Sequence, residues 1–256
     1  AKCLASVEKL VIPKKTIFHL CICVDGNLSA KTLSDISTFT NEVNIWCSVF
    51  FNSRSKGLAG NLNNVITKLN LGTNEFIMRM DADDIMHPLR LEKQLSFLRR
   101  NLSIDVVGTL ALRIDEAGNV LGQHGSYTAQ VYPSHIEKNP IIHPTALIRG
   151  DFFAKYGLYD ETFKYAQDWE LWSRACRQGA KFFVLSETLL KFRLQTASIK
   201  KRKLTQPYVR RLAWNNMHNR PLTMLILLRS LVIIATPTYV IKMFLLLANI
   251  LKKWRG

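Results

Sequence analysis

Acidic residues are missing from the last quarter of this 256-residue chain. The sequence has 35 Lys and Arg against 19 Asp and Glu, which gives a formal net charge of +16. Glu187 is the last acidic residue, so residues 1–187 hold 21 basic and 19 acidic side chains and carry +2, and residues 188–256 carry the other +14. Such a charge needs an acidic partner: nucleic acid, an anionic membrane surface or a phosphorylated substrate. Because 48% of the residues are hydrophobic, a disordered polyelectrolyte is excluded.

Paired cysteines and the common glycine-rich motifs are absent as well. The five cysteines form no Cys-x-x-Cys pair, so we expect buried, reduced thiols in a cytosolic protein. The sequence contains no G-x-x-x-x-G-K-[ST] loop, no G-x-G-x-x-G and no G-x-S-x-G elbow, the signatures of P-loop, dinucleotide-binding and α/β-hydrolase sites. The chain opens without Met and in the middle of a pattern, so we expect an N-terminal piece to be missing.

The first hundred residues alternate apolar runs typical of strands with periodic segments typical of helices. The expected strands are 16–25, 44–52 and 75–80, and the expected helices are 30–41, 58–69 and 87–100. This alternation predicts an α/β fold with a parallel sheet and right-handed crossovers. Ligands of such sheets bind beyond the carboxyl ends of the strands. Asp25 and Asp81–Asp84 both fall at such ends, so we expect one crevice to receive them.

The second part of the chain has shorter elements. We expect strands at 105–115, 120–123, 146–149, 182–185 and 189–192, and helices at 151–156 and 167–178. Residues 124–140 are polar and are predicted to be irregular.

The strongest local signal is the run Arg79-Met-Asp-Ala-Asp-Asp84 at the end of an apolar strand. Carboxylates crowded together repel one another unless a cation compensates them, and Mg²⁺ or Mn²⁺ prefers such oxygen ligands. The alternative is a helix N-terminus carrying acids that the helix dipole stabilises. Asp84 could serve only that purpose while Asp81 and Asp83 face the crevice.

Two further segments contain candidate functional residues. In Gln167-Asp168-Trp169-Glu170-Leu171-Trp172, an acid beside two indoles at the start of a helix suits a general base in a partly dry site. The alternative is an N-capping Asp with the Trp residues in the core. In His143-Pro144-Thr145, the histidine is either functional or a packed loop residue, and it lacks partners at zinc-ligand spacing.

Taken in order, these motifs resemble those of the family 2 glycosyltransferases with the GT-A fold, especially bacterial enzymes that build O-antigen, capsule or exopolysaccharide. The resemblance covers about residues 5–200. Its residues are Val24-Asp25-Gly26, Gly57-Leu58 with Asn63, the Arg79–Asp84 run, His143-Pro144-Thr145 and the Gln167–Trp172 segment. Val24 stands where many members have Asp, and Gln167 replaces their Glu. The family's first strand is expected to precede Ala1.

The resemblance implies a mixed sheet flanked by helices and an inverting transfer from a nucleotide-diphosphate sugar, with a UDP-sugar as the expected donor. It implies that Asp168 is the catalytic base, that Asp83 and Asp81 hold Mn²⁺ or Mg²⁺, and that His143 and Glu170 lie on the acceptor side. Asp25, Gly26, Asn63, Arg79 and Asp81 are the expected nucleotide-sugar contacts, with Lys56 and Arg193 as weaker candidates. The expected acceptor is a saccharide or a polyprenyl-diphosphate-linked saccharide.

The basic tail carries a long apolar stretch, 222–251, with Arg229 and Pro237 inside its first twenty residues. We divide the chain into a transferase domain, 1–203, that is incomplete at its N-terminus, and a helical tail, 204–256. The favoured interpretation places tail helices in the interface of the cytoplasmic leaflet of the inner membrane, with Lys and Arg at anionic headgroups. A spanning segment, or helices packed on the transferase domain, are the alternatives.

Three other functions compete with this one. The first is a truncated, catalytically impaired transferase that only binds nucleotide or membrane. The second is a nucleic-acid binder, but the basic residues of the tail border apolar runs, which suits lipid better, so we expect no nucleic-acid partner. The third is a phosphatase with Asp81 as nucleophile, for which no matching downstream residues were identified.

Overall fold

The computed structural model describes residues 2–52, 55–125, 128–131, 139–194, 198–215 and 220–235. Its strands are β1 (His19–Asp25), β2 (Trp46–Asn52), β3 (Phe76–Met78), β4 (Ile85–Met86), β5 (Val106–Ile114), β6 (Val120–His124), β7 (Thr128–Val131), β8 (Leu147–Arg149) and β9 (Phe182–Arg193). Its helices are α1 (Lys2–Glu8), α2 (Ala30–Glu42), α3 (Gly57–Leu69), α4 (Arg90–Arg100), α5 (Phe152–Tyr156), α6 (Gln167–Arg177), α7 (Ser198–Asn215) and α8 (Arg220–Ala235), with a 3₁₀ turn, η2 (His143–Thr145).

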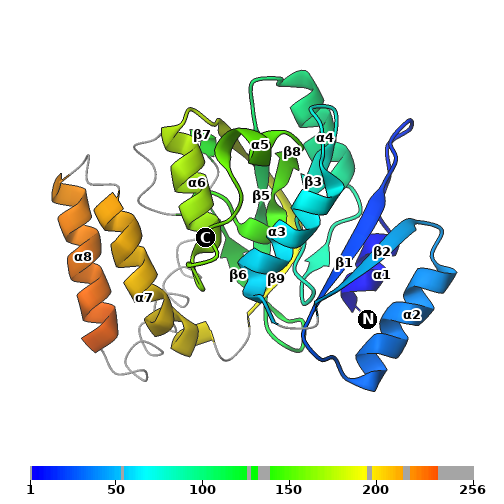
Figure 1. Ribbon diagram of the computed structural model, residues 1–256, viewed down its shortest axis with the longest axis horizontal. Helices are drawn as coiled ribbons and strands as arrows, with labels where there is room; N and C mark the ends of the chain where they lie inside the picture. The colour runs from blue at the N-terminus through cyan, green and yellow to red at the C-terminus, as the bar shows by residue number, and fades with distance from the viewer. Residues whose placement is uncertain are drawn as a thin grey trace.

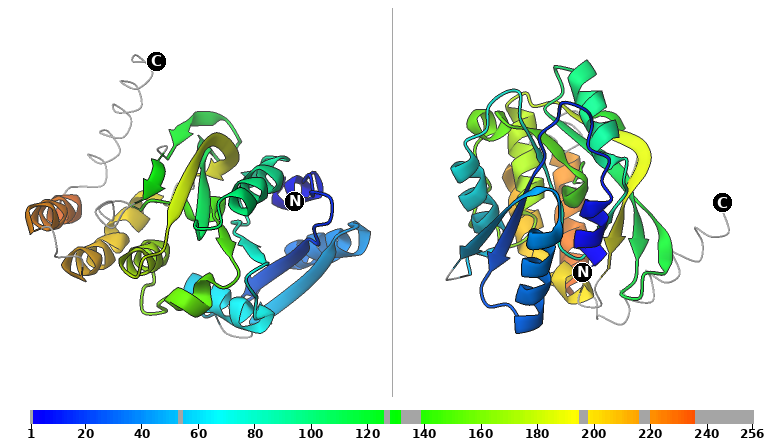
Figure 2. Two further views of the ribbon diagram at one scale, coloured as in Figure 1. Left: turned by 90° about the horizontal axis from the view of Figure 1, so that it is seen from above. Right: turned by 90° about the vertical axis from the view of Figure 1, so that its right-hand side faces the viewer.

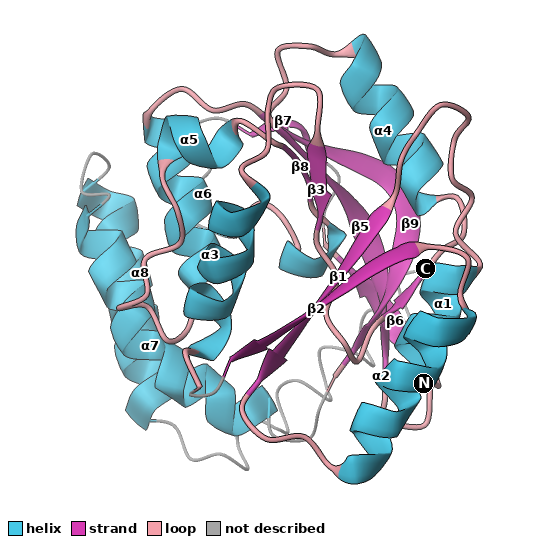
Figure 3. Ribbon diagram, turned by 45° about the vertical axis from the view of Figure 1, so that its right-hand side comes forward, coloured by secondary structure: helices cyan, strands magenta, loops and turns pink. Residues whose placement is uncertain are grey.

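A mixed sheet forms the centre of the fold, as the family resemblance implied, and helices flank it (Figure 1); it has seven strands in the described residues. Its order is β3-β8-β5-β9-β4, with β6 added to β5 and β7 to β9. Among the described strands of this sheet, β5 and β9 are parallel neighbours and the other pairs are antiparallel. Helices cover the strands on both sides in Figure 3. The long β5–β9 pair therefore supports the elements that carry the candidate residues.

The predicted single parallel sheet through the first three strands is wrong. β1 and β2 pair in parallel with each other and form a separate two-stranded sheet, whereas β3 pairs with β8 in the larger one. With α2, the two-stranded sheet lies at one side of the molecule, away from α7 and α8 (Figure 2). In the described part of the chain no strand hydrogen-bonds to both β1 and β3. Trp46 and Phe51 of β2 are consequently 63% and 64% exposed, although their sequence is typical of a buried strand.

Several predicted boundaries shift because tertiary pairing overrides local pattern. Ile85 and Met86 form β4 against Lys191 and Leu190 of β9, so α4 begins at Arg90 and not at the predicted residue 87. β7 lies in the segment predicted to be irregular. The two strands predicted within 182–192 are one strand, β9, whose register shifts opposite β5 between Thr109 and Ala111. The five cysteines are unpaired in the structure, and they are not all buried as predicted: Cys176 is buried and Cys23 is exposed.

The start of the tail packs on the sheet domain. Helix α7 crosses the predicted boundary at residue 203, buries Leu212, and places the Arg211 guanidinium 4.6 Å from the ring centre of Phe163. Helix α8 packs against α7, where Ser230 donates a hydrogen bond to the Gln206 carbonyl. Within the described residues no helix is long and apolar enough to cross a membrane. Residues 236–251 of the predicted apolar stretch lie outside the described residues.

Candidate functional site

Asp81, Asp83 and Asp84 lie in the turn that follows β3, and their carboxylates have different surroundings. Asp81 forms an ion pair with Arg79. Asp84 is 1% exposed; its Oδ1 accepts a hydrogen bond of 2.8 Å from the Arg193 N–H, and its Oδ2 has no hydrogen-bond partner. Burial raises the pKa of Asp84 to about 7. Because β4 lies between this turn and α4, the interpretation of these acids as a helix N-terminus is wrong.

A buried arginine stands behind the acidic turn. Arg90, at the start of α4, is fully buried and donates to the carbonyl of Arg79 at 2.8 Å and to that of Ala146 at 3.3 Å. Its Nε donates to Gln94 at 3.0 Å, and Gln94 in turn donates to the carbonyls of Val107 and Thr145, both at 2.8 Å. Burial lowers the pKa of Arg90 to about 9. This network fixes the end of β3 against β5 and η2. The sequence pattern does not reveal Arg90 beyond a charged residue on the apolar face of a predicted helix.

Arg193, the last residue of β9, also binds the acidic turn, on the side opposite Arg90. Besides its backbone bond to Asp84, its Nε donates to the Asp83 carbonyl at 2.8 Å. Its Nη1 donates to the carbonyls of Asp115 at 2.7 Å and Glu116 at 2.9 Å. The guanidinium therefore connects the acidic turn to the β5–β6 turn through backbone oxygens. Its predicted contact with a diphosphate stays a prediction.

Asp168 lies in the first turn of α6 and does not cap it. The N-cap position belongs to Ala166, in a left-handed conformation at φ +57°, so the N-cap alternative for Asp168 is wrong. The Asn139 amide donates to Asp168 Oδ2 at 2.5 Å. Burial raises the pKa of Asp168, the hydrogen bond from Asn139 opposes this shift, and the negative charge of Asp81 adds to it. Of the two flanking indoles, Trp172 is fully buried in the core and Trp169 is half-buried.

His143 and Asn63 belong to one buried network with Tyr159. His143 Nε2 lies 2.8 Å from the Tyr159 hydroxyl, and burial keeps the pKa of His143 well below its usual value, so the ring is neutral. The Asn63 side chain accepts from the Tyr159 N–H at 3.0 Å and donates to the Tyr159 carbonyl at 2.9 Å and to Glu161 at 3.0 Å. These bonds join α3 to the loop before α6. The predicted nucleotide contact of Asn63 and the acceptor contact of His143 stay predictions.

Asp25, at the end of β1, organises the loop that leads into α3. Its Oδ2 accepts from the Ser55 hydroxyl at 2.9 Å and its Oδ1 accepts from the Lys56 N–H at 3.0 Å. Burial acts to raise the pKa of Asp25, but hydrogen bonds from Ser55, Lys56 and Asn61 outweigh it, so the pKa lies below its usual value. Gly26 follows at φ +77°, a conformation that glycine adopts without strain. Asp25 and Gly26 thus form a rigid, ionised turn.

The contacts and charges show which predicted residues gather in one place. The charges of Arg79, Asp81 and Asp168 all act on the Tyr159 hydroxyl, which places the β3 turn and the start of α6 around the same spot. Arg79 also acts on the thiol of Cys23, so β1 ends within its electrostatic range. Glu170 points elsewhere: it is buried and paired with Arg174 at 2.9 Å. Its predicted place on the acceptor side stays a prediction.

The donors of the acidic turn have the chemistry that a hard divalent cation prefers. Asp81, Asp83 and Asp84 offer only carboxylate oxygens, and the buried Asp84 Oδ2 still has an unused acceptor. Within the described residues, however, no three acidic, cysteine or histidine side chains converge on one point. These residues fit such a cation only if other ligands, such as phosphate oxygens, complete its coordination.

Comparison with known structures defines the class of this fold. The chain superposes on the crystal structure of S. aureus TarS 1-349 in complex with UDP with a TM-score of 0.63 at 17% identity, over 90% of this chain and 66% of that one. It superposes equally well, at 12% identity, on the mannosyltransferase PcManGT from Pyrobaculum calidifontis in complex with GDP-Man and Mn²⁺, over 98% of this chain and 76% of that one. The fold is that of these glycosyltransferases. The chain spans just under two thirds of TarS 1-349.

The sequence comparison then identifies the family. The model of glycosyl transferase family 2 matches residues 1–157, and the chain belongs to this family. It is 29% identical over 209 residues to an uncharacterized glycosyltransferase of Methanocaldococcus jannaschii, covering 76% of this chain and 71% of the relative. It is also 29% identical over 211 residues to the O-antigen biosynthesis glycosyltransferase WbnJ of Escherichia coli, covering 78% and 77%. The predicted family and the predicted enzyme class, a glycosyltransferase, are confirmed.

Proposed function

We propose that the protein transfers a sugar from a nucleoside diphosphate sugar to a hydroxyl group of a saccharide acceptor, with inversion at the anomeric carbon. The acceptor oxygen attacks that carbon from the face opposite the diphosphate, and its proton passes to Asp168. The bond between the anomeric carbon and the diphosphate oxygen breaks, and the diphosphate leaves with the bonding electrons. A single displacement of this kind needs no enzyme nucleophile.

The observation that carries this proposal is the setting of Asp168. A half-buried carboxylate with a raised pKa, oriented by Asn139 and close enough to Asp81 to sense its charge, is suited to accept a proton beside a charged donor. Tyr159 and His143 form the buried support next to it. Glu170, two residues along α6 and turned away from Asp168, would act only as a positioning group, through its pair with Arg174.

Asp83, together with Asp81, would hold Mn²⁺ or Mg²⁺ against the donor diphosphate. When bound, such a cation neutralises the charge that develops on the leaving group. The proposal is supported by the oxygen-only donor set of the turn and by the Mn²⁺ in the P. calidifontis mannosyltransferase complex. Arg79 positions Asp81 through its ion pair, while Arg90 and Arg193 hold the backbone of the turn from its two sides.

A UDP-sugar is the proposed donor, and a surface polysaccharide precursor, carried on a lipid, is the proposed acceptor. TarS 1-349 was crystallised with UDP and with UDP-GlcNAc, which supports the first choice. The relatives from E. coli and Erwinia amylovora, named for O-antigen and amylovoran biosynthesis, support the second. A panel of UDP-, GDP- and dTDP-sugars, scored for thermal stabilisation and hydrolysis, distinguishes the donors. Stabilisation by GDP-mannose alone would refute a UDP-sugar donor.

The reaction is tested with Asp168→Asn. We expect this variant to bind the nucleotide sugar as the wild type does, measured by calorimetry, and to lose transfer by at least a hundredfold. Asp35→Asn, at an exposed position of α2, is the matched control and should transfer normally. Wild-type rates in Asp168→Asn would remove Asp168 from the base role. Full activity in the presence of a chelator would remove the metal. Nucleotide binding without transfer by the wild type would favour the impaired-transferase alternative.

We further propose that helix α8 rests on the cytoplasmic leaflet of the inner membrane. Met224, Leu228 and Leu231 stand on one side of α8 at helical spacing and are all more than half exposed, and Arg229 is exposed beside them. Leu228→Glu should reduce co-sedimentation with vesicles that contain anionic lipid. Leu102→Glu, in an exposed loop of the sheet domain, is the control. Equal sedimentation of both variants would contradict the role of α8.

A further inference from the structure

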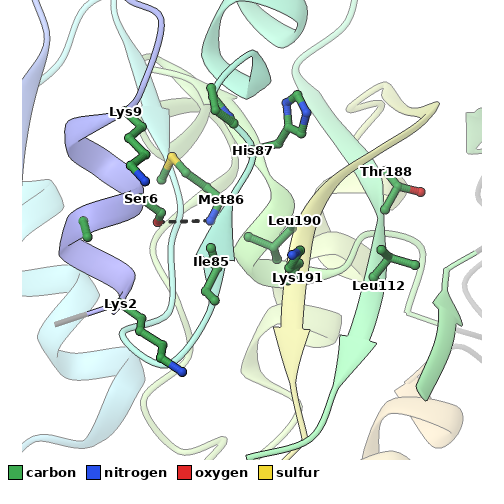
Figure 4. Close-up of a pocket in the computed structure, with 12 residues that line it drawn as sticks. Lys2, Ser6, Lys9, Ile85, Met86, His87, Leu112, Thr188, Leu190 and Lys191 are labelled. Atoms are coloured by element: carbon green, nitrogen blue, oxygen red, sulfur yellow. Dashed lines mark hydrogen bonds between the residues drawn. The ribbon is translucent and has the colours of Figure 1, made fainter. Parts of the chain in front are cut away.

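A cavity of about 490 Å³ lies between α1, β4 and β9, and none of the candidate site residues described above lines it (Figure 4). This volume falls within the usual range for small-molecule sites. The register of β4, β9 and β5 shows which side chains face the cavity from the sheet. Ile85, Lys191 and Leu112 are lateral neighbours on β4, β9 and β5, so their side chains leave the same face of the sheet. Ile85 and Leu112 on this face remain partly exposed, whereas Met86 and Leu190, which also line the cavity, are buried.

Helix α1 forms the side wall of the cavity. Lys2, Ala5, Ser6 and Lys9 line it at spacings of three, four and seven residues, which is one face of a helix. The two residues in the middle are small and leave room, while the lysines stand at the two ends, as Figure 4 shows. Ser6 uses its hydroxyl to fix the wall: it accepts from the Met86 N–H at 3.1 Å and donates to the Cys3 carbonyl at 2.6 Å.

The cavity is cationic at its rim. Lys2, Lys9 and Lys191 line it together with His87, and no Asp or Glu is among the lining residues. None of the ion pairs found in the described residues involves these three lysines. His87 accepts from the Leu89 N–H through Nδ1 at 3.2 Å, so the neutral ring carries its proton on Nε2 and can donate there. An apolar floor with a rim of donors suits a ligand with an apolar chain and an anionic head.

We infer that this cavity binds an amphiphile with a short apolar chain and a terminal phosphate. The chain would cover Ile85, Leu112 and Ala5, and the phosphate would lie among the lysines. A dianionic phosphate matches several ammonium groups better than a single carboxylate does. This site is separate from the proposed transfer site, and its existence does not depend on the transfer reaction.

Octyl phosphate, used below its micelle concentration, is the probe for calorimetry on the full chain. We expect saturable binding, and at least tenfold weaker binding of octyl glucoside, which lacks the charge, and of inorganic phosphate, which lacks the chain. Combined Lys9→Glu and Lys191→Glu should weaken octyl phosphate binding at least tenfold, and Ala5→Leu, which fills the cavity, should do the same. Combined Lys14→Glu and Lys31→Glu, at two exposed sites outside the cavity, is the charge-matched control. Equal affinity of the double variant and this control would overturn the site.

A footprint on the wild type decides the question even if a variant fails to fold. Octyl phosphate should slow the acetylation of Lys9 and Lys191 but not that of Lys31, as read by mass spectrometry. Equal protection of all three lysines, or protection of none, would show general adsorption or no binding, and either result refutes the proposal. Protection by inorganic phosphate alone would show an ion site that does not use the apolar floor, which also refutes it.

Discussion

The contact between Asn139 and Asp168 offers the sharpest test of the proposed chemistry. Asn139→Ala removes the donor that opposes protonation of Asp168. A hydrogen bond to a charged group contributes about 1.5–3 kcal/mol, and one pKa unit corresponds to about 1.4 kcal/mol. Asn139 is exposed, so solvent screening favours the lower end of this range. We therefore expect the pKa of Asp168 to rise by about one unit.

The sign of the effect on activity follows from the role of the carboxylate. A general base works only when it is deprotonated, so a higher pKa moves the acidic limb of the pH–rate profile of transfer to higher pH by about one unit. On that limb the rate at a fixed pH falls about tenfold, whereas well above the pKa the rate stays unchanged. Transfer rates measured from pH 5 to 9 give the profile. Carbon-13 NMR titration of the Asp168 carboxyl group gives the pKa independently of activity.

The control is Asn119→Ala, which removes an amide that donates to another carboxylate, Asp115, at 2.9 Å. Asp115 lies in an exposed turn outside the site, so this variant should leave the acidic limb in place. If Asn139→Ala folds normally and both its profile and the carboxyl titration match the wild type, Asn139 does not set the protonation of Asp168. If the titration shifts and the profile does not, Asp168 is not the base.

Two stability predictions follow from buried backbone contacts. Arg90→Ala leaves the Ala146 carbonyl without this donor and creates a cavity, so urea denaturation should show a loss of about 3–4 kcal/mol; Arg99→Ala, at the exposed end of the same helix, should lose less than about 1 kcal/mol. A Cβ added at Gly150 would stand 2.3 Å from the Gly72 carbonyl oxygen, so Gly150→Ala should cost about 1–3 kcal/mol in the same assay. Gly72→Ala meets nothing closer than 3.8 Å, so a comparable loss there would contradict the steric argument.

The hydrophobic pattern of the sequence correctly predicted those helices and strands that pack against one neighbouring layer of the fold. Helix α3, predicted at 58–69, and β2, predicted at 44–52, lie where expected because their periodicity reflects burial on one side or a continuous apolar run. β4 could not be predicted: two residues after an acidic turn carry no periodicity, and only their pairing with Leu190 and Lys191 makes them a strand. The placement of β1 and β3 in different sheets likewise depends on which strand edges hydrogen-bond to each other. The apolar sequence of the strands alone does not specify this.

The sequence predicted those site residues that form a motif of consecutive residues. It did not predict those whose role depends on contacts with residues far away in the chain. The acidic turn and Asp168 stood out because acids interrupt apolar patterns. Asn139 did not, because it lies in a polar stretch 29 residues from its partner and only the fold joins them. Asp25 was expected to meet a nucleotide base, and the structure adds a role that its position did not reveal: it fixes the loop before α3.

The positive charge of the chain serves more than one purpose. Of the 14 basic residues after Glu187, the structure assigns three to the sheet domain. Arg193 donates to the backbone of the acidic turn, Arg211 lies over Phe163 and near Asp160, and Lys191 stands at the rim of the cavity beside α1. Arg193 is held by short, directed hydrogen bonds and α7 by the buried Leu212, contacts that salt screens little, whereas attraction of the tail to an anionic membrane is long-ranged and weakens as salt rises. Raising the salt concentration should therefore release the protein from vesicles before it loosens α7 from the sheet domain.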